Sequence, residues 1–218
     1  MNRILIVSKT KMLNNRVCVG GIDLDNKISV RLMDINGSHE SAASCPYNIR
    51  EIWDVEYSRG KQRPLPHSED IRVVKKCKSG VLEGEKLMLA LLNEMQFHVY
   101  EDDIFNTFEG KLKYTEKGSF YISGDAVPNH STCFWICDRK ILRGDYKEKI
   151  RYNYLDTKRR WGFNFTYVGL EDNPSDFIRR GTLVRLSLAH WWKPEDADIE
   201  ERCYLQLSGW YEELKVES

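Results

Sequence analysis

Short runs in which apolar and polar residues alternate recur along most of this 218-residue chain, and they constrain the fold more than any other feature. The clearest runs lie at 16–19, 28–32, 53–57, 161–167, 182–191 and 202–210. Successive side chains of a strand point to opposite faces of a sheet, so this alternation predicts strands with one buried face. Turn residues such as Asp25-Asn26 and Gly144-Asp145 separate the runs. The sequence therefore predicts a mainly β protein with antiparallel sheets.

The predicted strands fall into two groups, each of the size of a small barrel. The first 80 residues contain five strand signals, which is the number of strands in an OB-type barrel. Strand signals return at Cys133 and continue to Trp210. Between the groups, apolar residues at helical spacing predict a short helix over 85–95. We therefore expect two tandem OB-like antiparallel β-barrels at 1–80 and 131–218, joined by a helix-containing connector at 81–130.

A weak internal repeat supports two copies of one unit. When residues 51–57 are placed over 182–188, the apolar residues Trp53, Val55 and Tyr57 fall on Val184, Leu186 and Leu188. In the strands that follow, Ile71 and Val73 fall on Cys203 and Leu205. The identity is slight, and many β proteins would show a similar pattern by chance.

Charge and hydropathy restrict the kinds of partner that the chain can take. Lys and Arg together number 33, and so do Asp and Glu, so a polyanion would have to bind a local basic patch. No run approaches the ~20 apolar residues of a membrane-spanning helix, and the apolar run at 4–7 is too short for a signal peptide. We expect a cytoplasmic protein without membrane contact, whose six scattered cysteines are reduced.

The predicted outer face of the second barrel is the first candidate site. If Val184, Leu186 and Leu188 point inward, Arg185 points outward, and the partner strand directs Arg202, Tyr204 and Gln206 outward as well. Cations, rings and amides are what single-stranded nucleic acid requires. A solvated or inter-domain face fits the pattern equally well. The first barrel carries Asp54 and Glu56 at the equivalent positions, which favours the second barrel for binding.

Basic turns are the second candidate. Arg159 and Arg160 precede Trp161, Phe163, Phe165 and Tyr167, whose strict alternation favours a place in the core for the rings. The two arginines could still contact phosphate. The predicted hairpin near the N-terminus also carries basic residues that could contact phosphate, namely Lys9, Lys11 and Arg16.

The segment His190-Trp191-Trp192 is the third candidate. Adjacent tryptophans cannot both lie on one face of a strand, so at least one of them is expected to be partly exposed. We expect Trp191 and His190 to form a ligand platform. Packing of these rings against the connector helix is the alternative.

Signals for catalysis, metals and cofactors are weak. His67-Ser68-Glu69 has the His-x-Glu spacing of zinc deaminases, but the chain contains no Cys-x-x-Cys, so a capping or pairing role for Glu69 and Asp70 is favoured. Cys133 and Cys137 share one face of a predicted strand but lack a second ligand pair. No phosphate-binding loop, dinucleotide motif or nucleophile elbow occurs. We expect a non-enzymatic protein without cofactor or metal.

Three segments, 66–70 (Pro-His-Ser-Glu-Asp), 183–192 and 201–211, resemble those of bacterial dual OB-containing domain proteins. The resemblance implies two OB folds and a role in nucleic-acid or nucleotide recognition, with antiviral defence as a proposed setting. It implies no catalytic residues.

The leading hypothesis is therefore a nucleic-acid-binding or sensing module. The alternatives are a protein-interaction adaptor for a separate effector enzyme, and a sensor of a small nucleotide held near His190 and Trp191. An enzyme is the least expected, since no acid, base, nucleophile or metal set converges.

Overall fold

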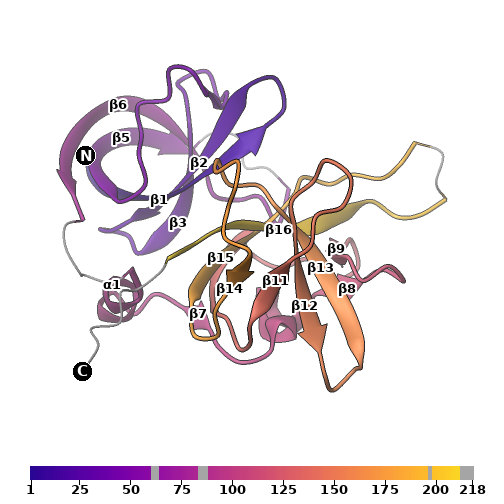
Figure 1. Cartoon of the computed structure of the whole chain (residues 1–218). Helices are drawn as coiled ribbons and strands as arrows, with labels where there is room; N and C mark the ends of the chain where they lie inside the picture. The colour runs from indigo at the N-terminus through magenta and orange to yellow at the C-terminus, as the bar shows by residue number, and fades with distance from the viewer. Residues whose placement is uncertain (60–63, 83–87, 196–197, 212–218) are drawn as a thin grey trace, which may run out of the picture. The chain divides into compact units, whose positions relative to one another are not determined.

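The computed structural model describes residues 1–59, 64–82, 88–195 and 198–211, which form two compact β units (Figure 1). The first unit comprises described residues of 1–64 and 68–97, and the second comprises 65–67 and the residues from 98 onward. The elements of the first unit are β1 (Asn2–Met12), β2 (Arg16–Asp23), β3 (Ile28–Met33), β4 (Glu40–Ser41), β5 (Glu51–Arg59), β6 (Asp70–Val81) and α1 (Met88–Glu94).

The second unit contains more strands, several of them short. They are β7 (Val99–Tyr100), β8 (Lys113–Tyr114), β9 (Phe120–Ser123), β10 (Thr132–Ile136), β11 (Ile141–Arg143), β12 (Arg151–Asp156), β13 (Trp161–Tyr167), β14 (Phe177–Ile178), β15 (Leu183–Leu188) and β16 (Arg202–Tyr211). Two 3-10 turns, η1 (Ile104–Asn106) and η2 (Phe108–Gly110), lie between β7 and β8. The boundaries expected near residues 80 and 130 stay a prediction.

The first unit is a closed five-stranded barrel. Strand β1 pairs antiparallel with β2, and β2 with β3. Strand β3 then pairs parallel with β6, β6 pairs antiparallel with β5, and β5 returns to β1. Its interior is filled by aliphatic residues and two rings, Tyr47 and Trp53, whose centroids lie 4.9 Å apart. The strand order and the single parallel pair are those of an OB barrel.

The second unit repeats this order. Its strands run β12–β13–β16–β15–β10, and β13 and β16 form the parallel pair. Strand β7 adds to β10, while β11 and β14 extend the other edge beyond β12. Among the described residues, no pairing joins β10 to β12, so hydrogen bonds do not close this barrel there. The expected fold class, mainly β with two OB-type units and a short helix, is confirmed.

The internal repeat corresponds to a structural equivalence. Strands β5 and β15 hold the same place in the two units, and so do β6 and β16. Tyr57 pairs with Val73 in the first unit, and Leu188 pairs with Leu205 in the second. These are the residues that the sequence alignment placed over one another, so the register of the predicted repeat is correct.

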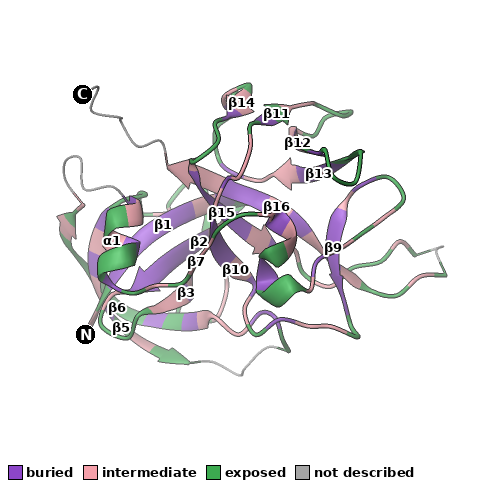
Figure 2. Ribbon diagram, turned by 90° about the horizontal axis from the view of Figure 1, so that it is seen from below, coloured by how far each residue is buried: buried purple, intermediate pink, exposed green. Residues whose placement is uncertain are grey.

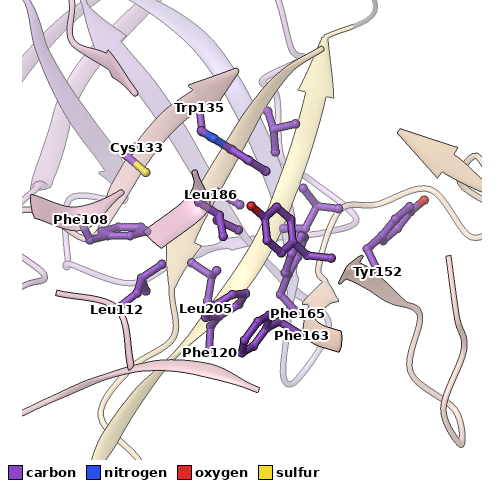
Figure 3. Packing of buried hydrophobic residues seen from close by; sticks show 14 of the residues in the cluster. Phe108, Leu112, Phe120, Cys133, Trp135, Tyr152, Phe163, Phe165, Leu186 and Leu205 are labelled. Atoms are coloured by element: carbon purple, nitrogen blue, oxygen red, sulfur yellow. The ribbon is translucent and has the colours of Figure 1, made fainter. Parts of the chain in front are cut away.

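The core of the second unit is aromatic (Figure 3). Phe120 and Phe163 stack at 4.9 Å, Phe165 lies beside them, and Leu205 covers the group from β16. The inward direction predicted for Val184, Leu186 and Leu188 is confirmed, because all three are buried. The core prediction also holds for Phe163 and Phe165. It is wrong for Trp161, which begins β13 and is 51% exposed.

The expected helix is present as α1, which buries Met88 and Leu92. The rest of the predicted segment before it lies outside the described residues. Buried positions follow most of the strands, whereas α1, the loops and much of β6 carry exposed positions (Figure 2). No helix among the described residues is both long and apolar enough to cross a membrane.

Candidate nucleic-acid interface

One face of the second unit gathers three aromatic rings and an arginine on neighbouring strands. Tyr204 of β16 pairs directly with Tyr121 of β9, so both rings lie on the same face. Arg202, two residues before Tyr204, pairs with Trp192 through two backbone hydrogen bonds of 3.1 and 2.9 Å. We call Tyr121, Trp192, Arg202 and Tyr204 the aromatic platform.

The rings of the platform are spaced for contact. The Trp192 and Tyr204 centroids lie 6.1 Å apart, as do those of Tyr204 and Tyr121. The Arg202 guanidinium lies 4.2 Å from the Tyr121 centroid, which is cation–π distance. Trp192 is 55% exposed, so a large part of its indole faces solvent. A flat ring of a ligand can stack on Trp192, beside the positive charge of Arg202.

The charges around the platform are nearly balanced. Arg202 lies 3.8 Å from Glu200, and its Nε is buried without a hydrogen bond among the described residues. Lys113, which pairs with Tyr121 from β8, forms an ion pair with Asp125 at 2.7 Å. The hydrogen bond from Lys113 lowers the pKa of Asp125. The platform therefore offers ring surface more than net positive charge.

The structure brings together only some of the residues predicted from the sequence. Arg202 and Tyr204 belong to the platform, and the half-buried Gln206 follows them along β16. Trp191 is half-buried, and its Nε1–H donates to the Leu65 carbonyl at 3.1 Å. The exposed tryptophan of the pair is therefore Trp192.

Arg185 differs most from the expectation. It was predicted on the solvent-facing side of the second barrel, but it is only 5% exposed. Its neighbours Val184 and Leu186 face the core, so Arg185 lies on the outer face of β15 as predicted. That face is covered at this position, so the expected exposure to solvent is wrong.

Arg159 is held in an ion-pair network. It pairs with the buried Asp156 and with Asp103, and its guanidinium lies 3.8 Å from the Phe105 centroid. Burial raises the pKa of Asp156, but hydrogen bonds from Arg159 and Lys158 outweigh that effect, and the net shift is downward. Contact with a phosphate would compete with these partners.

The remaining predicted residues lie elsewhere. Arg160 is exposed at the turn before β13 with a positive φ of 52°. Lys9, Lys11 and Arg16 lie on the β1–β2 hairpin of the first unit, where Arg16 donates to the His39 carbonyl at 2.9 Å. His190 is exposed, and its ring lies 4.7 Å from that of His67.

The segment with zinc-deaminase spacing is packed into the structure. His67 is buried, and its Nε2 lies 3.2 Å from the Ala189 carbonyl and 3.8 Å from the Cys203 sulfur. Asp70 forms an ion pair with Arg31, which is the pairing role expected for this segment. Among the described residues, no cluster of His, Cys, Asp or Glu could hold a metal ion.

Two OB units define the class: a nucleic-acid- or oligomer-binding module, of a fold that generally binds rather than catalyses. The chain belongs to the dual OB-containing domain family, whose model matches residues 2–210. No curated protein and no solved structure matches it.

Tyr121 and Trp192 are the site residues that sequence reasoning missed. Tyr121 lies in a segment expected to be a connector, and all four residues of β9 are buried, so the strand shows no alternation. For Trp192 a signal existed, since one of the two adjacent tryptophans had to face outward.

Proposed function

We propose that the chain is a non-enzymatic module that binds single-stranded nucleic acid on the aromatic platform of the second unit. One observation carries the proposal: the exposed Trp192 ring shares a face with Tyr204, Tyr121 and Arg202. Bases of any sequence can stack on such rings, since every base has a π face. The few cations nearby favour stacking over sequence readout.

The charge balance sets the expected salt dependence. Arg202 and Lys113 are the two cations that the contacts of the described residues place beside the platform rings, and each can neutralise one phosphate. Two phosphate contacts on a single strand give a slope of about −1.4 in a plot of log K against log salt. A much steeper slope would indicate a binding surface other than the platform.

Fluorescence anisotropy with a labelled oligothymidine or oligouridine tests the proposal at low salt. Stacking on an aromatic side chain contributes about 1–3 kcal/mol per base, so Trp192→Ala should weaken binding about 5- to 150-fold. Trp161→Ala is the matched control, because Trp161 is equally exposed but lies on β13. The proposal fails if both variants bind like the wild type, or if the wild type binds neither DNA nor RNA.

We also propose a setting and a second candidate. The resemblance to bacterial family members supports a cytoplasmic role in prokaryotic antiviral defence. The balanced net charge supports the second candidate, an adaptor for a separate effector enzyme. A partner protein retained on the chain after nuclease treatment would favour the adaptor. The small-nucleotide sensor finds less support, because Trp191 is half-buried and its Nε1 is already hydrogen-bonded.

A further inference from the structure

Arg185, in the middle of β15, is a buried cation. It is only 5% exposed, and no described residue forms a hydrogen bond or an ion pair with its guanidinium. Burial raises the pKa values of Cys133 and Tyr211, and the nearby charge of Arg185 opposes both increases. Among the described residues, the charge of Arg185 therefore acts on a thiol and a phenol.

Hydroxyl groups lie on the same face of the sheet. Ser187 lies two residues from Arg185 on β15 and pairs directly with Thr132 of β10. Ser208 of β16 donates a 2.6 Å hydrogen bond to Ser187, which places its side chain on this face as well. The Thr132 hydroxyl is buried and has no hydrogen bond among the described residues. Arg185 thus shares its face with three hydroxyls.

The strand opposite Arg185 leaves room. Gly209 pairs with Arg185 next to a bulge in the β15–β16 pairing, and its φ is +156°. A Cβ atom at Gly209 would meet nothing within 4 Å. Among the described residues, the position directly paired with Arg185 is therefore open.

A buried charge without a partner is costly, typically several kcal/mol, and a buried hydroxyl without a hydrogen bond adds to this. A bound anion would remove both costs. A carboxylate would use both of its oxygens to bind the guanidinium. A phosphate group can bind the guanidinium in the same way and has further oxygens that accept hydrogen bonds from the hydroxyls. We propose that Arg185 anchors a phosphate-binding site on the outer face of β10, β15 and β16, with Thr132 and Ser187 as its hydroxyl donors and Ser208 holding Ser187 in place.

This inference goes beyond the proposed function and does not depend on it. Gly209 and Tyr204 lie five residues apart on β16, which corresponds to about 17 Å of strand. A phosphate held at Arg185 is therefore distinct from a base stacked on the platform. The ligand can be free phosphate, the terminal phosphate of a nucleotide, or a backbone phosphodiester, since all present the same oxygens.

Thermal unfolding of the full chain, titrated with inorganic phosphate against chloride at equal ionic strength, tests the proposal. A ligand that binds only the folded state raises its stability, so phosphate should raise the wild-type melting temperature. Arg185→Met should weaken phosphate binding at least about tenfold, the effect of losing a charge-assisted hydrogen bond. Without phosphate, this variant should be as stable as the wild type or more so, since it removes an unpaired buried charge. Thr132→Val should also weaken phosphate binding.

The control is Arg202→Met, which removes a cation of the platform and should leave the phosphate shift intact. The proposal is overturned if phosphate does not raise the wild-type melting temperature above chloride, or if Arg185→Met and Thr132→Val both keep the full shift. It is also overturned if Arg185→Met is destabilised without phosphate.

Two further comparisons identify the source of the phosphate and distinguish the Arg185 proposal from the platform proposal. A preference for 5′-phosphorylated over 5′-hydroxyl oligonucleotides, lost in Arg185→Met, identifies a terminal phosphate as the ligand. Equal affinity for both oligonucleotides, reduced in the variant, identifies the backbone. If Trp192→Ala has no effect on oligonucleotide binding while the phosphate shift persists, the platform proposal fails and the Arg185 site stands.

Discussion

Glu51, at the start of β5, should make the first barrel sensitive to acid. Its carboxylate is 8% exposed and accepts hydrogen bonds from Lys78 at 2.7 Å, from Trp53 Nε1 at 3.0 Å, and from the Asn48 backbone and side chain at 2.8 and 3.0 Å. Burial raises the pKa of Glu51, but these donors outweigh it and lower the pKa to about 2. The folded protein therefore holds this group as an anion.

The direction of the effect follows from linkage. A carboxyl whose pKa is lower in the folded state stabilises the fold above its unfolded pKa, and this contribution is lost as pH falls toward the folded pKa. The shift from 4.5 to about 2 corresponds to roughly 3 kcal/mol. Because Lys78 is 47% exposed and solvent screens its charge, we expect about 2 kcal/mol.

Urea unfolding of wild type and Glu51→Gln at pH 7 and pH 3 measures this contribution. The variant should lose about 2 kcal/mol at pH 7, and the difference should fall by about half at pH 3. Trp53 is the only tryptophan of the first unit, so its indole NMR resonance, resolved from those of the other five tryptophans, reports on this barrel. An equal loss at both pH values would refute the electrostatic explanation, and so would no loss at pH 7.

Three further predictions test other parts of the structure. Phe163→Ala should destabilise the second unit by about 3–5 kcal/mol in chemical denaturation, because it leaves a cavity in the aromatic core. Gly118→Ala should lower the melting temperature, since Gly118 has a φ of +74° and a Cβ would lie 2.3 Å from the Gly162 carbonyl, whereas Gly124→Ala meets open space and should be tolerated. Arg159→Gln should lower thermal stability but change oligonucleotide affinity by less than about twofold, because its guanidinium is engaged by the buried Asp156 and by Asp103. A larger loss of affinity would return Arg159 to the binding surface.

Much of the fold could be predicted because alternation reports directly on which side of a strand is buried. It identified the inward residues of β15 and even the register of the repeat, since Tyr57 and Leu188 occupy equivalent pairs. Alternation gave a wrong prediction where a residue that fits the pattern lies beyond the part of the strand that the core covers. Trp161 keeps the alternation of β13 but lies at its end, where the barrel no longer covers it.

The site was less predictable, because exposure and strand neighbours depend on tertiary packing. Alternation correctly excluded Arg185 from the interior of the barrel but could not show that the outer face is buried there. The bridge between Trp192 and Arg202 joins segments that no local pattern connects. Tyr121, the neighbour of Tyr204 on β9, could not be predicted for the same reason.

Photo-crosslinking of a 5-iodouridine oligonucleotide to the full chain, followed by peptide mapping, tests the central claim most directly. We predict crosslinks at Trp192 or Tyr204, which Trp192→Ala reduces and Trp161→Ala does not. Crosslinks confined to the hairpin of Lys9 and Lys11, or to the turn at Arg160, would contradict the account.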